Sequence, residues 1–319
     1  MFAILKKKLK NNVTIKHLVW KTKAMLSRLL YTDKEFLFKK YRQTYGYLPN
    51  IECPKLFNEK LLWTQLNYRD DLYARCADKY AVRAYVQEKV GEKYLIKCLG
   101  IYRKWEEINL DSLPKSFVLK ATHGSGWNFL CPDKARLNIK DCRNEINYWL
   151  STNYYVKNRE WNYKYIEPRV ICEEFIGEES GTPPLDYKFY CFNGVVKFVQ
   201  LCIDRYEGEQ KHNIYDTDWK QIKNVRTTME QDFTREYKKP EKWEEMLEIS
   251  RKLSEDFNFV RVDLYYINNI IYFGELTFFP GGGIYTHFSP NSFHAEMGSW
   301  LTLPDRNIDV WNEPNIYID

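Results

Sequence analysis

Apolar residues follow a helical repeat in the first third of the chain and a strand-like alternation after it. Residues 13–31 place apolar side chains on one helical face and basic side chains largely off it, which predicts an amphipathic helix. Residues 55–110 contain few helix breakers and predict further helices, with Gly91 as a stop. From about residue 114, short apolar or alternating runs predict strands, interrupted by a helix at residues 241–257.

Two predicted hairpins dominate the strand-rich part. Asn193-Gly194 separates one pair of apolar runs, and this dipeptide favours a two-residue hairpin turn. Asn268-Asn269 separates a second pair in the same way. Helices followed by antiparallel hairpins with interspersed helices predict an α+β fold rather than a doubly wound sheet. Two strand-rich lobes are expected to meet near residues 172–177.

Composition narrows the class of protein. The 319 residues are 44% hydrophobic and 29% charged, which is typical of globular proteins and excludes disordered and fibrous classes. No run of about 18 apolar residues exists, so the sequence predicts no membrane-spanning helix. The eight cysteines form no C-x-x-C pair, which disfavours structural zinc. Without a secretion signal they favour reduced thiols in a cytoplasmic protein.

Charge is concentrated at the N-terminus. Residues 1–40 contain 11 Lys+Arg and 2 Asp+Glu, a local charge of +9 in a chain of net charge +5. The remainder is therefore mildly acidic, which argues against a nucleic-acid partner. The basic helix either packs on the body with its charges in water or lies against anionic lipid. In the second case each basic residue near the membrane surface contributes about 1 kcal/mol to the binding free energy.

A glycine loop follows the predicted strand at residues 116–121. The strand ends at Lys120, and Gly124 and Gly126 would let backbone N–H groups approach an anion. No helix follows the loop, so it is not a Walker P-loop. By itself a Gly-Ser-Gly segment is more often an ordinary hairpin turn.

Charged residues recur on the predicted strands. Asp263 and Glu275 lie on the two strands of the second hairpin, where they can face each other. Facing carboxylates repel, and Mg²⁺, which takes one or two carboxylates plus phosphate oxygens, would neutralise them. Arg261 shares a strand face with Asp263 and is suited to hold phosphate oxygens. Asp186 and Lys188 form a similar pair. The alternatives are a solvated carboxylate pair and a surface ion pair of little value.

The order and spacing of these segments resemble the ATP-grasp superfamily, specifically its TupA-like (teichuronopeptide biosynthesis) branch, over about residues 40–285. The segments that carry the resemblance are KLFNEKLLW, ADKYAVRAYV, FVLKATHGSGWN, CEEFI, DYKFYCFNGVVKF and RVDLYYINNIIYFGELTFFPGGG. The resemblance implies an ATP-grasp fold in which two α+β lobes clamp ATP, preceded by a helical N-terminal region. The implied divisions are a basic amphipathic helix region at 1–40, a helical part at 41–110, a first lobe with a glycine-rich lid at 111–172 and a second lobe with the metal site at 173–319.

The resemblance also implies ATP and Mg²⁺ as cofactors and assigns roles to single residues. The D-x(11)-E spacing is similar to that of D-alanine–D-alanine ligases, in which a Pro-Gly segment after the metal motif helps to hold the acceptor. Residues 280–283 look similar. The implied roles are phosphate contacts for Lys79, Lys120 and Lys188, the mobile lid for Gly124, Ser125 and Gly126, adenine binding for Glu173, Glu174, Phe175 and Ile176, ribose binding for Asp186, metal binding for Asp263, Glu275 and Thr277, and catalysis for Lys120, Lys188 and Arg261.

Three features depart from the superfamily. Thr277 stands where an Asn is usual, so the choice between one and two Mg²⁺ ions stays open. The usual N-terminal substrate domain is missing or reduced to helices, so no acceptor site is carried over. His123, inside the lid segment, has no firm match and is either a turn-stabilising histidine or a phosphate contact.

The implied reaction joins a carboxylate to an amine through an acyl phosphate and releases ADP. The branch is associated with cell-surface polysaccharides, which suggests a uronic acid of a capsule or teichuronic-type glycan as the carboxylate and an amino acid or other amine as its partner. Such an enzyme would work in the cytoplasm, with peripheral contact to a membrane-bound assembly. Two alternatives remain: a glycosyltransferase, for which residues 216–218 supply a short D-x-D motif, and a non-catalytic ATP-binding protein. The sequence predicts no oligomeric state.

Overall fold

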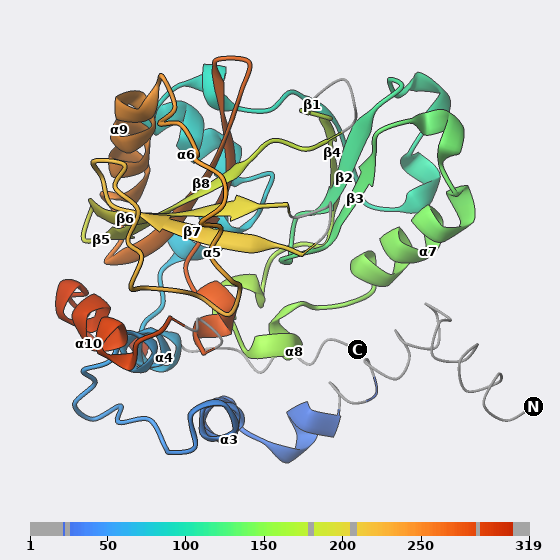
Figure 1. Ribbon diagram of the computed structural model, residues 1–319. Helices are drawn as coiled ribbons and strands as arrows, with labels where there is room; N and C mark the ends of the chain where they lie inside the picture. Colours follow the sequence, from blue (N-terminus) through green and yellow to red (C-terminus); the bar gives the residue numbers. More distant parts are fainter. Residues whose placement is uncertain (1–21, 23–25, 178–181, 205–208, 285–287, 309–319) are drawn as a thin grey trace, which may run out of the picture.

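The computed structural model describes residues 22, 26–177, 182–204, 209–284 and 288–308 (Figure 1). Most of the basic helix predicted at 13–31 lies outside these residues. In its described last turn Leu26, Leu29 and Leu30 are exposed. Within the described ranges, no helix combines the length and the apolar character that crossing a membrane requires.

Helices form the first part of the fold, as predicted, and they end at Lys89. Thr32 starts the first of them with a capping box, because its hydroxyl accepts from the Glu35 amide while the Glu35 carboxylate accepts from the Thr32 amide at 2.8 Å. Gly46 ends the same helix with a left-handed φ of 83°. The helices are α3 (Asp33–Tyr45), α4 (Phe57–Asn67), α5 (Asp71–Ala77) and α6 (Val82–Lys89).

A four-stranded antiparallel sheet makes up the first lobe, in the order β1-β4-β2-β3. Its edge strand β1 lies within the stretch predicted as helical, so that prediction is wrong there. The strand is short, pairs only with β4 and carries no alternating pattern. The sheet and its connections span 98–174, beyond the predicted lobe bounds at both ends. The strands are β1 (Cys98–Tyr102), β2 (Phe117–Ala121), β3 (Asn128–Cys131) and β4 (Val170–Glu174).

One face of the first sheet packs on α7 (Ile139–Leu150), beside β2 in Figure 1. Phe117 and Leu119 of β2 are fully buried in this core with Ile146 of α7. Because side chains alternate along a strand, Val118 and Lys120 point the other way. They face a cleft between the two sheets.

A five-stranded antiparallel sheet makes up the second lobe, in the order β7-β6-β5-β8-β9. Both predicted hairpins are present, and Asn193, Asn268 and Asn269 have the positive φ that such tight turns require. The predicted helix forms α9 (Trp243–Ser254). The strands are β5 (Asp186–Phe192), β6 (Val195–Ile203), β7 (Lys211–Tyr215), β8 (Phe259–Ile267) and β9 (Ile270–Thr277).

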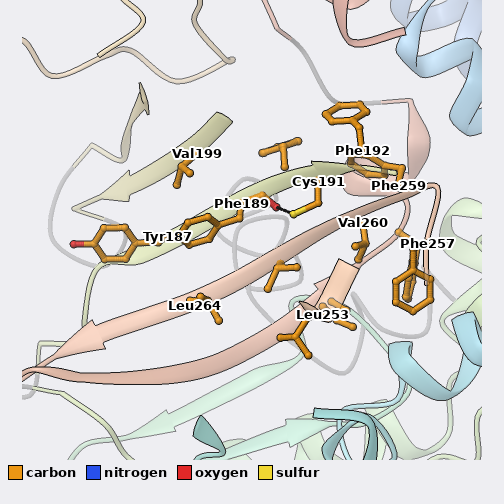
Figure 2. Close-up of a cluster of buried hydrophobic side chains, with 14 of the residues drawn as sticks. Tyr187, Phe189, Cys191, Phe192, Val199, Leu253, Phe257, Phe259, Val260 and Leu264 are labelled. Atoms are coloured by element: carbon orange, nitrogen blue, oxygen red, sulfur yellow. Dashed lines mark hydrogen bonds between the residues drawn. The ribbon is translucent and has the colours of Figure 1, made fainter. Parts of the chain in front are cut away.

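The apolar face of this sheet packs against α9 and forms the main core. Phe189 and Cys191 of β5 lie beside Val260 and Leu264 of β8, with Leu253 of α9 over them (Figure 2). The residues between them on β5 and β8 therefore point to the opposite face, toward the first lobe. The alternation of these two strands is what positions the charged residues described below.

Short elements complete the fold below the second sheet. The side-chain amide of Asn58 in α4 donates to the carbonyl of Gly283 at 3.0 Å and so holds the glycine-rich turn after β9. The remaining helices are α8 (Tyr155–Asn158) and α10 (Asn291–Trp300), which packs on α4. The 3-10 turns are η1 (Glu92–Tyr94), η2 (Trp105–Glu107), η3 (Leu110–Ser112), η4 (Lys134–Arg136), η5 (Trp161–Tyr163) and η6 (Pro280–Gly283).

Candidate active site

Asp263 and Glu275 face each other across β8 and β9, as the hairpin predicted, but only because β9 contains a bulge. The ladder pairs Leu264 with Phe273 and then Asp263 with Glu275, which leaves Gly274 as the extra residue. Without this bulge Glu275 would share the apolar face with Phe273. A Cβ atom at Gly274 would lie 3.0 Å from the Asp263 carbonyl, so the glycine permits the close approach.

Cations bridge the carboxylates of this face. Lys188 Nζ lies 2.5 Å from Asp263 Oδ2 and 2.7 Å from Asp186 Oδ2. Arg261 Nε lies 2.6 Å from Asp263 Oδ1, and its Nη2 lies 3.2 Å from Glu275 Oε1. The predicted carboxylates and cations of the second lobe therefore form one connected network. A surface ion pair, the alternative for Asp186 and Lys188, is excluded because both are buried.

Burial and pairing compete within the network. Burial alone would lower the pKa of Lys188, but Asp186 and Asp263 raise that pKa above its ordinary value. Burial likewise opposes the charge of Arg261, and Asp263 raises the Arg261 pKa. For Asp263 burial raises the pKa, and Arg261 and Lys188 oppose that shift. The charges of Lys188 and Arg261 are therefore kept by their carboxylate neighbours, and removal of Asp263 would leave both cations buried without that compensation.

Lys79 joins the loop after β2 to this network. Its Nζ donates to the Gly124 carbonyl at 2.8 Å and lies 3.5 Å from Glu275 Oε2. His123, in the same loop, is buried, and its Nε2 lies 2.8 Å from the Trp149 carbonyl. This contact with the end of α7 favours the turn-stabilising interpretation of His123 over a phosphate contact.

An apolar cleft lies between the two sheets. Phe175 and Ile176 line it, as does Asp186, and Lys120 enters it from β2. The side chain of Glu173, a residue expected at adenine, holds Lys120 at 2.6 Å. The cleft has the apolar lining of a small-molecule site with a few polar groups at one end.

A polar cavity adjoins this cleft and shares Asp186 with it. Residues that the sequence did not single out also line it. Gln200 is a polar residue within an apolar run of β6, and that break in the pattern could have marked it as a site residue. His212 lies on β7, where no strand was predicted from the sequence. The predicted residues that line it are Ser125, Gly126, Asp186, Lys188, Arg261, Asp263, Glu275, Pro280 and Gly281.

The donor set fits Mg²⁺ held jointly with a phosphate. In the described part of the chain no group of three or more His, Cys, Asp or Glu side chains is arranged to hold a metal. Mg²⁺ commonly takes one or two carboxylates together with substrate phosphates. Asp263 and Glu275 supply that number, and the Thr277 hydroxyl lies beside them, 3.2 Å from Glu275 Oε1.

The D-x-D motif has a structural explanation. The Asp216 carboxylate accepts from the backbone amides of Asp218 at 2.9 Å and Lys220 at 2.8 Å. These bonds close the turn after β7, as aspartate does in Asx turns. The motif therefore gives no support to the glycosyltransferase alternative.

The sequence matches the model of the TupA-like ATP-grasp family over residues 59–302. The chain belongs to the TupA-like ATP-grasp family. The predicted family and the predicted α+β ATP-grasp fold with a helical N-terminal region are thereby confirmed. No curated protein matches the sequence.

Solved structures similar to this TupA-like ATP-grasp protein include ligases. D-alanine–D-alanine ligase from Helicobacter pylori is 12% identical, with a TM-score of 0.43 over 79% of this chain and 68% of its own. The Bacillus anthracis enzyme complexed with ATP is 15% identical, with a TM-score of 0.36 over 63% of this chain and 53% of its own. The ATP-grasp ligase PsnB complexed with a phosphomimetic variant of its minimal precursor, Mg and ADP is 11% identical, with a TM-score of 0.39 over 76% of this chain and 65% of its own. The chain thus spans about half to two thirds of these structures.

Proposed function

We propose that this protein is an ATP-dependent, ADP-forming carboxylate–amine ligase. The observation that carries the proposal is the continuous cleft of a TupA-like ATP-grasp protein, apolar between the sheets and charged beyond Asp186. Adenine would occupy the apolar part and ribose would lie at Asp186. The phosphates would then reach Lys120 and Lys188, and Mg²⁺ would be held by Asp263 and Glu275.

The first step activates the carboxylate. Its oxygen attacks the γ-phosphorus of ATP, the bond from phosphorus to the β-γ bridging oxygen breaks, and ADP and an acyl phosphate form. Lys120, Lys188 and Arg261 offset the charge on the transferring group, a task that is mainly electrostatic. Mg²⁺, when bound, supplies further charge neutralisation on the phosphate oxygens. The loop at Gly124–Gly126 would shield the acyl phosphate from water.

The second step forms the amide. The amine nitrogen attacks the acyl carbon, the bond from carbon to the phosphate oxygen breaks, and inorganic phosphate leaves. For the carboxylate we propose a uronic acid of a cell-surface polysaccharide of the capsule or teichuronic type, and for the amine an amino acid. This choice of substrate class rests on the association of the branch with cell-surface polysaccharides.

A peripheral position at the inner face of the membrane is part of the same proposal. The +9 charge of residues 1–40 and the exposed Leu26, Leu29 and Leu30 support it. Deletion of residues 1–30 is expected to leave ADP release unchanged and to reduce binding to vesicles containing anionic phospholipid. Loss of folding in that variant would show instead that the helix belongs to the core.

The decisive experiment measures ADP release over uronic acids paired with amino acids. Hydroxylamine should trap the acyl phosphate as a hydroxamate when the amine is omitted. Lys120→Ala is expected to lower turnover by about 10²–10³-fold and to weaken ATP binding, because one preorganised charge is lost. Release of AMP, or consumption of a nucleotide sugar, would overturn the ligase proposal. ATP binding without turnover over the whole screen would favour a non-catalytic protein.

A further inference from the structure

A second cavity adjoins the polar cavity at Arg261. It shares Ser125, Arg261 and Gly281 with the polar cavity, so the two meet where the transferring phosphoryl group would lie. Its outer wall comes from α3, α8 and η5, and the residues there had no assigned role. They are Lys40, Lys157, Asn158, Glu160 and Tyr163.

Glu160 is the unusual residue of this wall. It is 4% exposed, yet it lines the cavity. Among the described residues its carboxylate has one hydrogen-bond partner, the side-chain amide of Asn158 at 3.1 Å, and no cation within 4.0 Å. A buried carboxylate without a paired cation is costly. A cationic group on a molecule in the cavity would supply the missing partner.

Two lysines also line this cavity. Lys40 Nζ donates to the Lys157 carbonyl at 2.9 Å and to Asn158 Oδ1 at 3.0 Å, which fixes its position at the wall. Lys157 is exposed at the rim. The cavity therefore presents one buried acid and two lysines, which complements a molecule carrying both an ammonium and a carboxylate.

We propose that this cavity is the amine-substrate site, that it takes an amino acid with its ammonium on Glu160 and its carboxylate toward Lys40 and Lys157, and that Glu160 accepts the ammonium proton. This inference rests on the proposed ligase function. One ammonium proton passes to the Glu160 carboxylate and leaves a neutral amine. The nitrogen–carbon bond then forms, the carbon–oxygen bond to phosphate breaks, and the second proton leaves the nitrogen for solvent.

The electrostatics of Glu160 suit this role. Burial raises its pKa to about 7, while Asn158, Lys157 and Lys40 oppose the shift and Glu275 adds to it. A proton acceptor works best when its pKa lies near the working pH. The charged groups around Glu160 are the two lysines of α3 and α8, the carboxylate of Glu275 on β9 and Arg261 of β8, which lines the same cavity.

The test compares two nucleophiles in one enzyme. Hydroxylamine is uncharged near neutral pH, so it needs neither an anchor for an ammonium nor a group that accepts an ammonium proton, and the one proton that it loses after attack leaves for solvent. Glu160→Gln is expected to form hydroxamate at the wild-type rate and to lose at least 100-fold in kcat/KM for the amino acid. Lys40→Met is expected to raise KM for the amino acid but not for its carboxamide. Glu167→Gln, a change of an exposed carboxylate seven residues on, is the matched control and should behave as wild type.

The outcomes separate the two proposals. Amide formation by Glu160→Gln at the wild-type rate would overturn the role of Glu160. An equal loss of hydroxamate and amide would also overturn it, since Glu160 would then serve the first step or the fold. Equal use of amino acid and carboxamide by wild type would overturn the carboxylate contact. Failure of wild type to form any hydroxamate would instead overturn the ligase function. A thermal shift of the Mg–ADP-loaded protein by amino acids, lost in Glu160→Gln, would then still identify the site, and its absence in wild type would remove it.

Discussion

The two faces of the five-stranded sheet are built from the same strands, but one is an apolar core face and the other carries buried charges. On one face Phe189, Val262 and Leu264 are fully buried against the α9 core. On the other, Lys188 and Asp263, their immediate neighbours in sequence, are buried against each other as charges. Burial of apolar area stabilises by about 25 cal/mol per Å², whereas burial of an ion pair roughly offsets its own attraction. The apolar face holds the sheet together, and the charged face is held in place by it.

Glu275→Gln is the sharpest way to separate the faces, because it removes one charge and keeps the shape. ADP formation is expected to fall at least about 10³-fold, since the change removes the proposed metal carboxylate where charge would be offset in the transition state. Circular dichroism and the melting temperature should stay close to those of the wild type. Full activity in this variant would remove the metal assignment of Glu275.

Leu264→Ala tests the other face at a position adjacent to Asp263. Truncation of a fully buried leucine is expected to lower the free energy of unfolding by about 2–5 kcal/mol. Turnover by the folded protein should be unchanged, because Leu264 points away from the cleft. Denaturant unfolding and kcat, measured on the same preparation, check both halves. A large loss of kcat at full folding would show that the faces are not independent.

The difference in stability between Glu160→Gln and the wild type should depend on pH. Below pH 4.5, the ordinary pKa, Glu160 is protonated in both folded and unfolded chains and contributes nothing. Between 4.5 and about 7 the unfolded chain releases the proton and the folded chain keeps it, so stability falls as pH rises. At about 1.4 kcal/mol per pH unit, the variant should exceed wild type by up to about 3 kcal/mol at pH 8 and match it near pH 4. If the variant and the wild type were equally stable at both pH values, the raised pKa of Glu160 would be contradicted.

Thr277→Asn is the variant with the smallest expected effect, and it tests how many metal ions the site holds. An amide oxygen is a better ligand than a hydroxyl, so the half-saturating Mg²⁺ concentration should fall a few-fold, equivalent to about 1 kcal/mol. Thr277→Val is the control, because it removes the oxygen that accepts from Arg261 Nη2 at 3.0 Å. Identical Mg²⁺ titrations for all three proteins would exclude Thr277 as a ligand.

Strand alternation and turn chemistry made much of the second lobe predictable. Asp186 and Lys188 were placed on one face correctly because they are two residues apart on a strand. Asp263 and Glu275 were expected to face each other, but the reason was incomplete. The Asn268-Asn269 turn alone sets Glu275 on the apolar face, and the bulge at Gly274 restores it. A glycine inside a strand was the local signal for that bulge.

The second cavity could not be predicted in the same way. Glu160 lies in a segment without periodic pattern or motif, and its significance depends on which residues surround it. Lys40 lines the same cavity from a helix 120 positions earlier in the chain, and Arg261 lines it from a strand about 100 positions later. Sequence spacing describes neighbours along one element, whereas this wall is assembled only when distant elements pack together.

The pairing of Asp263 with Arg261 and Lys188 would make metal and nucleotide binding at the proposed site cooperative. Mg²⁺ alone must compete with two cations already on Asp263, and a polyphosphate alone must draw those cations from their carboxylates. When both arrive, the metal takes the carboxylates and the phosphates take the cations, so each ligand removes the competitor of the other. We therefore expect a favourable coupling free energy, by which nucleotide raises the affinity for Mg²⁺ as much as Mg²⁺ raises the affinity for nucleotide.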